Sequence, residues 1–146
     1  MSNEYTSDDN SQILKSITAQ VVDDAKRLDA LPRHFGRAML RVEHTIYNFL
    51  NQLCADYQGG YWEFYELSNG GFYMAPRTDR KFFLQCENGF SRELSGDAAG
   101  IVACLYAFSH MAFAEPSADN ISTHFHHLRD FACEHADAAL IFAAID

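Results

Sequence analysis

The sequence lacks an apolar run long enough to cross a lipid bilayer. Its longest such run, near residues 101–108, is far short of the roughly 20 residues that a membrane-spanning helix needs. The opening residues, Met1-Ser2-Asn3-Glu4-Tyr5, contain neither the basic nor the apolar segment of a secretory signal peptide. We therefore expect a cytoplasmic protein without a membrane segment.

Cysteine and histidine ligands at metal-binding spacing are also missing. The four cysteines, at positions 54, 86, 104 and 133, form no C-x-x-C pair, and in a reducing compartment such thiols pack as small hydrophobic groups. In the run His124-Phe125-His126-His127, His124 and His127 are neighbours on an expected helix. Zinc needs a third ligand from another element, and no residue stands at a diagnostic spacing. The sequence therefore predicts no bound metal and no other cofactor.

No phosphate-binding loop, nucleophile elbow or metalloprotease motif is present. The pairs Gly59-Gly60 and Gly70-Gly71 have no lysine behind them, and neither G-x-S-x-G nor H-E-x-x-H occurs. Cys133 lies among apolar residues of an expected helix, which predicts a buried, unreactive thiol. Asp97 and Asp130 are each explained as carboxylates that stabilise a helix. We therefore predict no catalytic residues and no enzyme activity.

Positive charge is scarce. Twenty aspartates and glutamates stand against eleven lysines and arginines, which gives a formal net charge of −9. Residues 95–146 carry −6 of this charge, from seven carboxylates and Arg129. DNA binding needs a basic stripe and is not expected. A DNA mimic needs denser carboxylates, because a duplex carries a charge about every 1.7 Å. Solubility is the simplest explanation of the acidity.

The apolar residues that are present predict one domain with its own core. With 146 residues and 48% hydrophobic composition, the chain is long and apolar enough to fold without disulfides. An N-terminal helix is predicted by the stripe Ile13, Ile17, Val21, Ala25 and Leu28. Pro32 should end it, because proline disfavours helical geometry at the preceding residue. Helical spacing also predicts helices at 38–57, at 95–115 behind the N-cap Ser95, from 119 or 120 to 132, and around 140–144.

Alternating aromatic residues between these helices predict strands at 61–67, 72–76, 82–87 and 90–94. The sequences Asn69-Gly70-Gly71 and Asn88-Gly89 are typical of hairpin turns. Connections this short exclude parallel crossovers. We expect an α+β fold: an antiparallel β-meander of three to four strands packed against about five helices, with Trp62, Phe64 or Phe72 in the core.

The aromatic hairpin permits two interpretations. Tyrosine, tryptophan and arginine anchor protein interfaces, so one interpretation is an exposed patch of Tyr61, Trp62, Tyr65, Tyr73 and Arg77. The other is that Trp62, Phe64, Phe72 and Met74 fill the core beneath the helices.

Four blocks of this sequence resemble the ArdB/KlcA family of antirestriction proteins. They are Leu31-Pro32-Arg33-His34-Phe35-Gly36, the hairpin at 57–76, the segment 88–102 with Leu94-Ser95-Gly96-Asp97, and the stretch 127–146. The blocks occur in order from residue 31 to the end. The resemblance therefore predicts an antirestriction domain at 31–146, preceded by a variable N-terminal extension (residues 1–30) that contains a helix.

The resemblance implies a protein of a plasmid or other mobile element that inhibits host type I restriction endonuclease activity. The family is not understood as enzymes, and it is distinct from the strongly acidic DNA mimics. Our hypothesis for the mechanism is contact with the host type I restriction-modification complex, by a monomer or weak homodimer that binds neither DNA nor membrane. The alternatives are an acidic DNA mimic, or a metal-dependent enzyme acting on nucleic acid.

On the contact hypothesis, the working surface consists of exposed residues that the fold does not need. We predict two groups of residues on it. The first is the hairpin group, Tyr61, Tyr65, Asn69 and Tyr73. The second belongs to the acidic C-terminal part and consists of His126, Arg129, Asp130 and Asp146.

Overall fold

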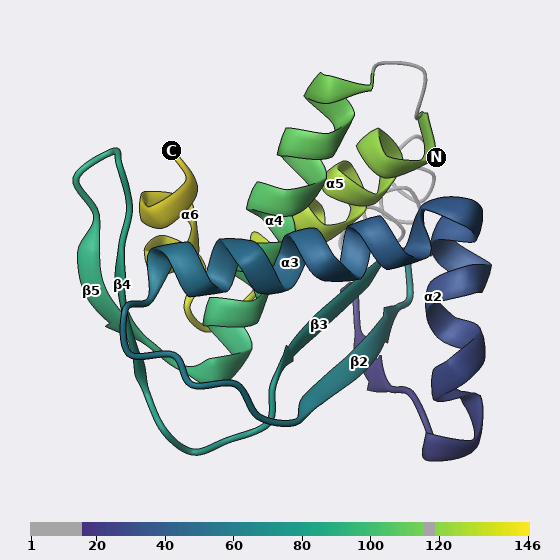
Figure 1. Ribbon diagram of the computed structural model, residues 1–146, viewed down its shortest axis with the longest axis horizontal. Helices are drawn as coiled ribbons and strands as arrows, with labels where there is room; N and C mark the ends of the chain where they lie inside the picture. Colours follow the sequence, from purple (N-terminus) through teal and green to yellow (C-terminus); the bar gives the residue numbers. More distant parts are fainter. Residues whose placement is uncertain (1–15, 116–118) are drawn as a thin grey trace, which may run out of the picture.

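The computed structural model describes residues 16–115 and 119–146, which form two antiparallel sheets and the helices that pack against them (Figure 1). The strands are β1 (Ala19–Val21), β2 (Trp62–Leu67), β3 (Phe72–Pro76), β4 (Phe82–Gln85) and β5 (Ser91–Leu94). The α-helices are α2 (Arg27–Phe35), α3 (Met39–Leu53), α4 (Gly96–Ala114), α5 (Asp119–Ala132) and α6 (Ala138–Ile145). Short 3-10 turns precede α2 and α3. The predicted α+β class is confirmed, as are the helices expected after residue 38.

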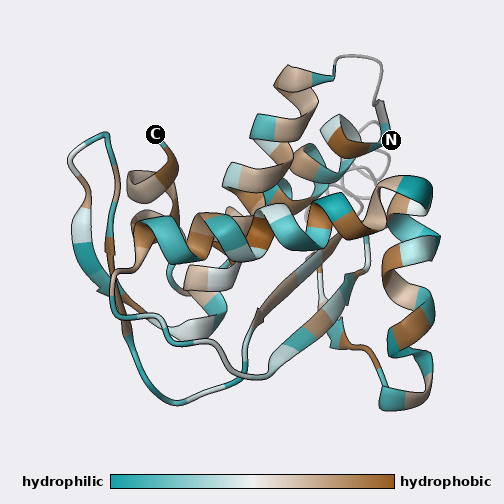
Figure 2. Ribbon diagram, in the orientation of Figure 1, coloured by the Kyte–Doolittle hydropathy of each residue, from teal (hydrophilic) through white to brown (hydrophobic). Residues whose placement is uncertain are grey.

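The central helix α4 is apolar over most of its circumference. By length and composition alone it could cross a membrane, contrary to what the shorter apolar run at 101–108 led us to expect, but 61% of its most apolar window is buried inside the protein. Helices α3, α5 and α6 and strand β3 pack against it. By contrast, polar and apolar residues alternate along α2 and α3 (Figure 2). The difference identifies α4 as the core helix and the other two as amphipathic covering helices.

Small residues on α4 allow it to cover the open edge of β3. Gly96, Gly100 and Cys104 are spaced by four and therefore share one face of the helix. A Cβ atom at Gly100 would lie only 2.4 Å from the Cβ of Ala75, and one at Gly96 would lie 2.8 Å from the Pro76 carbonyl oxygen. The Cys104 thiol donates to the Met74 carbonyl at 3.5 Å. The helix thus lies directly against the backbone edge that another strand would otherwise pair with.

This contact explains why the predicted single meander is wrong in one respect. Strands β2 and β3 form a hairpin, and β4 and β5 form another, with the expected antiparallel registers. The hairpins belong to separate sheets, because α4 occupies the edge of β3 that β4 would need. The core prediction is confirmed: Trp62, Phe64 and Phe72 are all buried.

The N-terminal prediction is also corrected. The described residues of the expected first helix include a strand, β1, which pairs antiparallel with β2 through Ala19 opposite Leu67. Ile13 lies outside the described residues. The N–H of Val22 donates to the Phe64 carbonyl at 2.8 Å. The free edge of β2 needed backbone partners, and this long-range requirement outweighs the local helical spacing.

Pro32 does not end a helix, contrary to expectation. It lies inside α2, where Ala30, Leu31 and Phe35 are buried against the sheet. A proline within a helix costs about 3 kcal/mol. Burial of three apolar side chains, at roughly 1.5–3 kcal/mol for each larger one, outweighs that cost. Residues on both sides of position 30 therefore contribute to the same core.

Candidate functional site

Tyr73 does not lie on the surface, contrary to the predicted hairpin group. It is 2% exposed, and its ring is stacked between Tyr65 at 4.5 Å and Phe131 of α5 at 5.7 Å. The alternation of β3 places it on the face that α4 and α5 cover. Tyr65 is half-buried beneath the same stack, so only Tyr61, at 48% exposure, is a freely exposed aromatic of this group.

Asn69 has a structural role in the β2–β3 turn. Its side-chain oxygen accepts from the Gly71 N–H at 3.0 Å, and its amide group donates to the His127 carbonyl of α5 at 3.0 Å. A Cβ atom at Gly71 would lie 2.8 Å from the His127 Cβ. The turn is therefore docked on α5, and the half-buried Asn69 holds it there.

A polar network joins β3, the start of α4 and the turn after α5. The Asp97 carboxylate accepts from the Tyr73 hydroxyl at 2.7 Å and contacts Nε2 of His135 at 2.7 Å. The Asp137 N–H donates to Nδ1 of His135 at 2.9 Å, so the proton of the neutral ring is on Nε2. The hydrogen bond to Asp97 raises the pKa of His135. Sequence reasoning assigned Asp97 to the helix N-terminus and did not find its two partners.

The carboxylate–imidazole pair resembles part of a catalytic triad, but the third group does not fit nucleophilic catalysis. Burial, followed by the nearby Asp97, raises the pKa of the Tyr73 hydroxyl, which keeps it protonated. Cys133 was expected to be buried and is instead exposed, because it lies at the solvent side of the turn after α5. The network therefore holds three elements together.

Substitution of Asp97 with alanine should destabilise the protein by about 1–3 kcal/mol, because two buried donors lose their acceptor. Urea denaturation monitored by circular dichroism measures the change. The matched control is Asp79→Ala, which removes an exposed carboxylate from the loop between β3 and β4. Equal stability of the two variants would contradict a stabilising role for the network.

Three histidines from two helices meet at one end of the sheet. His34 of α2 has its ring centroid 5.0 Å from that of His124, which lies 6.4 Å from that of His127. The Glu66 carboxylate lies 2.8 Å from Nε2 of His34 and also forms an ion pair with Arg33. His124 is only 4% exposed, and burial, reinforced by the neighbouring His34 and His127, lowers its pKa to about 4. At neutral pH it is an uncharged core residue.

His34 is a neighbour of the His124–His127 pair that sequence spacing did not reveal. In the described part of the chain, Nδ1 of His124 and Nδ1 of His127 are buried without a hydrogen-bond partner. Within residues 16–115 and 119–146, no three His, Cys, Asp or Glu side chains have a geometry suited to a metal ion. The absence of a metal remains a prediction.

The C-terminal group of predicted residues is exposed as expected, and its role remains a prediction. His126 and Asp130 lie on the outer side of α5. Arg129 lies over the Phe142 ring at 5.2 Å and lines, with Asp146, a hollow of about 140 Å³. The end of α6 beside this hollow is held in place, because Tyr106 donates to the Ala144 carbonyl at 2.7 Å.

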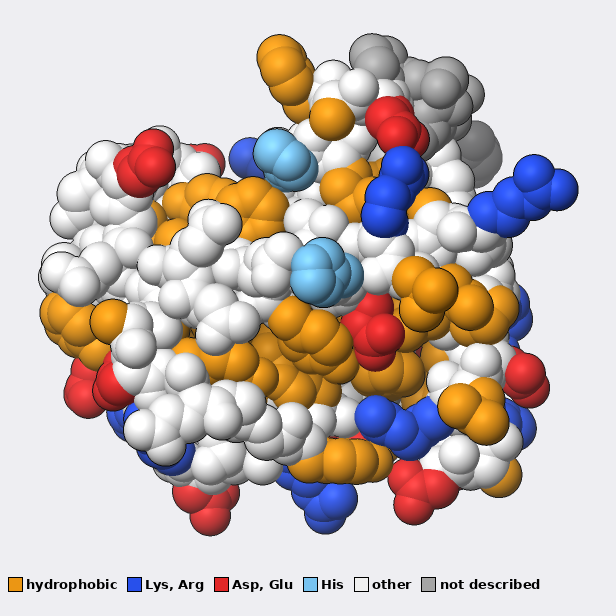
Figure 3. Space-filling model, in the orientation of Figure 1, with side chains coloured by type: hydrophobic (Ala, Val, Ile, Leu, Met, Phe, Trp, Pro, Cys, Tyr) orange, Lys and Arg blue, Asp and Glu red, His pale blue; other side chains and the backbone are white. Residues whose placement is uncertain are grey.

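An exposed apolar feature at α2 and α3 was not predicted from the sequence. Leu28 of α2 is 90% exposed and Leu40 of α3 is 70% exposed. Both line a hollow of about 270 Å³, together with Arg27, Leu31, Pro32, Met39, Glu43 and Phe64. We call these eight residues the α2–α3 face. Hydrophobic side chains gather over this junction in Figure 3. Sequence reasoning had assigned Leu28 to a buried stripe. Leu40 falls outside the apolar stripe of α3, and this position was the available signal that an apolar side chain would be exposed.

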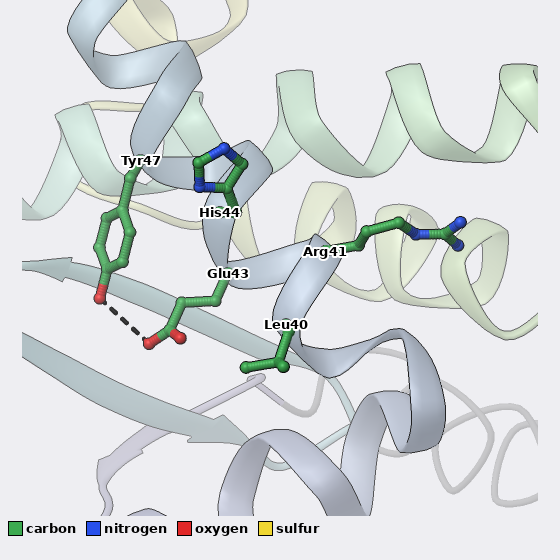
Figure 4. A pocket seen from close by; sticks show the side chains of 5 residues that line it. All are labelled: Leu40, Arg41, Glu43, His44 and Tyr47. Atoms are coloured by element: carbon green, nitrogen blue, oxygen red, sulfur yellow. Dashed lines mark hydrogen bonds between the residues drawn. The ribbon is translucent and has the colours of Figure 1, made fainter.

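A second hollow continues from Leu40 along α3. It measures about 490 Å³ and is lined by Leu40, Arg41, Glu43, His44 and Tyr47 (Figure 4). The Tyr47 hydroxyl donates to Glu43 at 3.2 Å, and burial raises the pKa of that hydroxyl. Arg41 extends away from the hollow to Glu115, with two hydrogen bonds of 2.8 and 3.0 Å. Leu40 is therefore an exposed apolar side chain that lines both hollows.

Comparison with known proteins gives one consistent result. The model of the antirestriction protein family matches residues 55–146. The chain is 47% identical over 142 residues to antirestriction protein KlcA of Escherichia coli, covering 92% of this chain and 97% of the relative. It is 32% identical to the putative antirestriction protein YubI of Escherichia coli strain K12, covering 92% and 99% of the two chains.

A solved structure from work on the KlcA and ArdB proteins is similar in fold as well. The TM-score is 0.85 at 45% sequence identity, over 90% of this chain and 96% of that one. The KlcA and ArdB proteins are described as having a novel fold and as showing antirestriction activity against type I DNA restriction systems in vivo but not in vitro.

Proposed function

Because this chain belongs to the antirestriction protein family, we propose that it relieves type I DNA restriction in the cell by contact with the host restriction system. The resemblance first noted in four sequence blocks is confirmed by the family match and by relatives of nearly equal length. We further propose that the protein acts in the cytoplasm, where incoming DNA meets the restriction complex. The proposal involves no catalytic step.

One observation carries this proposal. The fold agrees with the KlcA and ArdB structure over nearly the whole of both chains, at 45% identity. Agreement of this extent includes the surface elements as well as the core, so a shared working surface is expected.

Protein contact is favoured over DNA mimicry by two arguments. A mimic that fills the DNA channel should inhibit the purified enzyme, whereas the relatives act in vivo but not in vitro. The net charge of −9 on 146 residues is also sparse beside a duplex. We therefore propose that the contacted partner, or the contacted state of the restriction complex, exists only in the working cell.

Phage plating tests the proposed function. Unmodified phage should plate on a type I restricting host that expresses this protein nearly as well as on a restriction-free host, because restriction is relieved. Plating on the restriction-free host and plating of modified phage are the controls, and neither should change with expression. Equal plating of unmodified phage with and without the protein would refute the proposal.

An assay of the purified restriction enzyme, compared with the phage plating, separates contact from mimicry. A mimic should inhibit the purified restriction enzyme with a steep dependence on salt, because it competes with phosphate contacts. Relief in cells without such inhibition supports contact. Salt-sensitive inhibition of the purified enzyme would favour the mimic.

A further inference from the structure

Basic residues concentrate on the part of the molecule that also exposes the two leucines. Residues 26–41 hold five of the eleven lysines and arginines but only one of the twenty carboxylates, so this segment carries +4. The rest of the chain therefore carries −13, since the total is −9. The segment comprises α2 and the start of α3, which provide Leu28 and Leu40. Lys26, Arg27 and Arg37 thus lie within three positions of Leu28 or Leu40 in the chain, and Glu43 is the one carboxylate among the eight residues of the α2–α3 face.

The cations of this segment differ in what they contact. Arg33 pairs with Glu66, and Arg41 pairs with Glu115. Lys26 and Arg37 are exposed and form no ion pair within the described ranges 16–115 and 119–146. Two side chains are therefore free to meet a negatively charged partner.

Arg27 is held at the side of the hollow by contacts with two aromatic rings. Its guanidinium lies over the Phe64 ring at 4.1 Å and over the Tyr61 ring at 4.7 Å. Its Nη1 is 3.9 Å from Glu63, is buried, and has no hydrogen-bond partner among the residues that the structure describes. The ring contacts and Glu63 therefore fix Arg27 beside the hollow, and Lys26 and Arg37 remain as the exposed cations of the segment.

We propose that the α2–α3 face binds an acidic amphipathic helix of a partner protein. A leucine-sized anchor of that helix enters the 270 Å³ hollow between Leu28 and Leu40. Its flanking aspartates or glutamates meet Lys26 and Arg37. The inference rests on the proposed function in one respect: it assigns the partner to the host restriction system.

Two other occupants fit less well. Nucleic acid would place phosphates beside Leu28 and Leu40, and three of the five cations already contact carboxylates of the chain. A two-fold dimer through this face would set the +4 segment against its own copy, because the same surface is used twice in such an interface. Acidic apolar protein is the partner that satisfies both the charge and the exposed leucines.

Phage plating with matched variants tests the surface. The variant Leu28→Glu/Leu40→Glu should lose protection, so that plating falls to the level of a restricting host without the protein. The control is Phe83→Glu on β4, where the phenylalanine is 41% exposed on the other sheet, and it should protect like wild type. Arg37→Glu should weaken protection, whereas Arg92→Glu, an exposed arginine of β5, should not. Unchanged thermal unfolding midpoints show that each variant is folded.

Crosslinking identifies what occupies the face. A photoreactive amino acid at position 40 should form an adduct, in restricting cells, with an acidic helix of a restriction-system subunit, and one at position 83 should not. An adduct with nucleic acid or with a second copy of this chain would overturn the inference. Full protection by the folded Leu28→Glu/Leu40→Glu variant would also overturn it. Failure of wild-type protein to protect would instead overturn the proposed function.

Discussion

Substitution of Gly100 with alanine is expected to destabilise the protein by about 3 kcal/mol, and valine at this position should prevent folding. A Cβ atom there would lie 2.4 Å from the Cβ of Ala75, 2.5 Å from its Cα and 2.6 Å from the Met74 carbonyl oxygen. Two of these three atoms belong to the backbone of β3. They can move only if the strand moves, so α4 would have to leave the edge of the sheet.

The direction of the stability change in Gly100→Ala distinguishes a tight helix–strand contact from an ordinary helix position. Alanine in place of glycine within a helix normally stabilises it by about 1 kcal/mol, because glycine loses more backbone entropy. The opposite result at Gly100 therefore measures the helix–strand contact directly. Urea denaturation gives the free energy of unfolding, and Ser109→Ala on the exposed side of α4 is the control, which should change little. A stabilised Gly100→Ala variant would mean that α4 does not lie this close to β3.

Acidification should remove about 3 kcal/mol of stability through His124 alone. The pKa of this residue falls from an ordinary value of 6.5 to about 4 in the folded protein, mainly through burial. Between these values the unfolded chain binds the proton more readily than the folded chain does. The stabilising contribution is therefore complete above pH 6.5 and is lost as the pH falls through 4.

Neighbouring groups determine how this acid effect is measured. His34, His127, Glu66 and Arg33 surround the site, and the first two disfavour a further positive charge. The pKa of His135 is raised by Asp97, so its contribution has the opposite sign and is lost as the pH rises. The free energy of unfolding, measured by denaturation at several pH values, should therefore depend less on pH in His124→Phe than in the wild type. The exposed His126→Gln variant should keep the wild-type slope, and a wild-type slope in His124→Phe would contradict the assignment.

Features that depend on near neighbours in the chain were predictable from the sequence. The hairpin β2–β3 follows from alternating residues around Asn69-Gly70-Gly71, and its strands end within one residue of the prediction. Helix α4 begins after Ser95, whose side chain accepts from the Ala98 N–H at 3.1 Å. The exposure of His126, Arg129 and Asp130 was likewise expected from the polar side of their helix. In each case the signal lies within a few residues.

Features that depend on distant contacts were not predictable in this way. Helical spacing of Ile17, Val21 and Leu28 gave no sign that residues 19–21 would pair with β2, more than forty positions along the chain. Tyr73 is buried because Phe131 and Asp97, from two later elements, meet at its ring and hydroxyl. The exposure of Leu28 follows from the direction in which α2 packs. A periodic pattern shows that a helix has an apolar side but does not show how much of it another element will cover.

The sequence by itself determined the α+β class, most element boundaries and, through its resemblance to a family, the function. The class and the boundaries depend on backbone propensities and turn residues, and the resemblance depends on short sequence motifs. All of these can be recognised without knowledge of tertiary contacts. Only the tertiary structure decided that α4 closes the edge of β3, that β1 closes the edge of β2, and that Leu28 and Leu40 remain uncovered. Each of these outcomes is a competition between distant segments for the same surface, and the winner depends on packing in three dimensions.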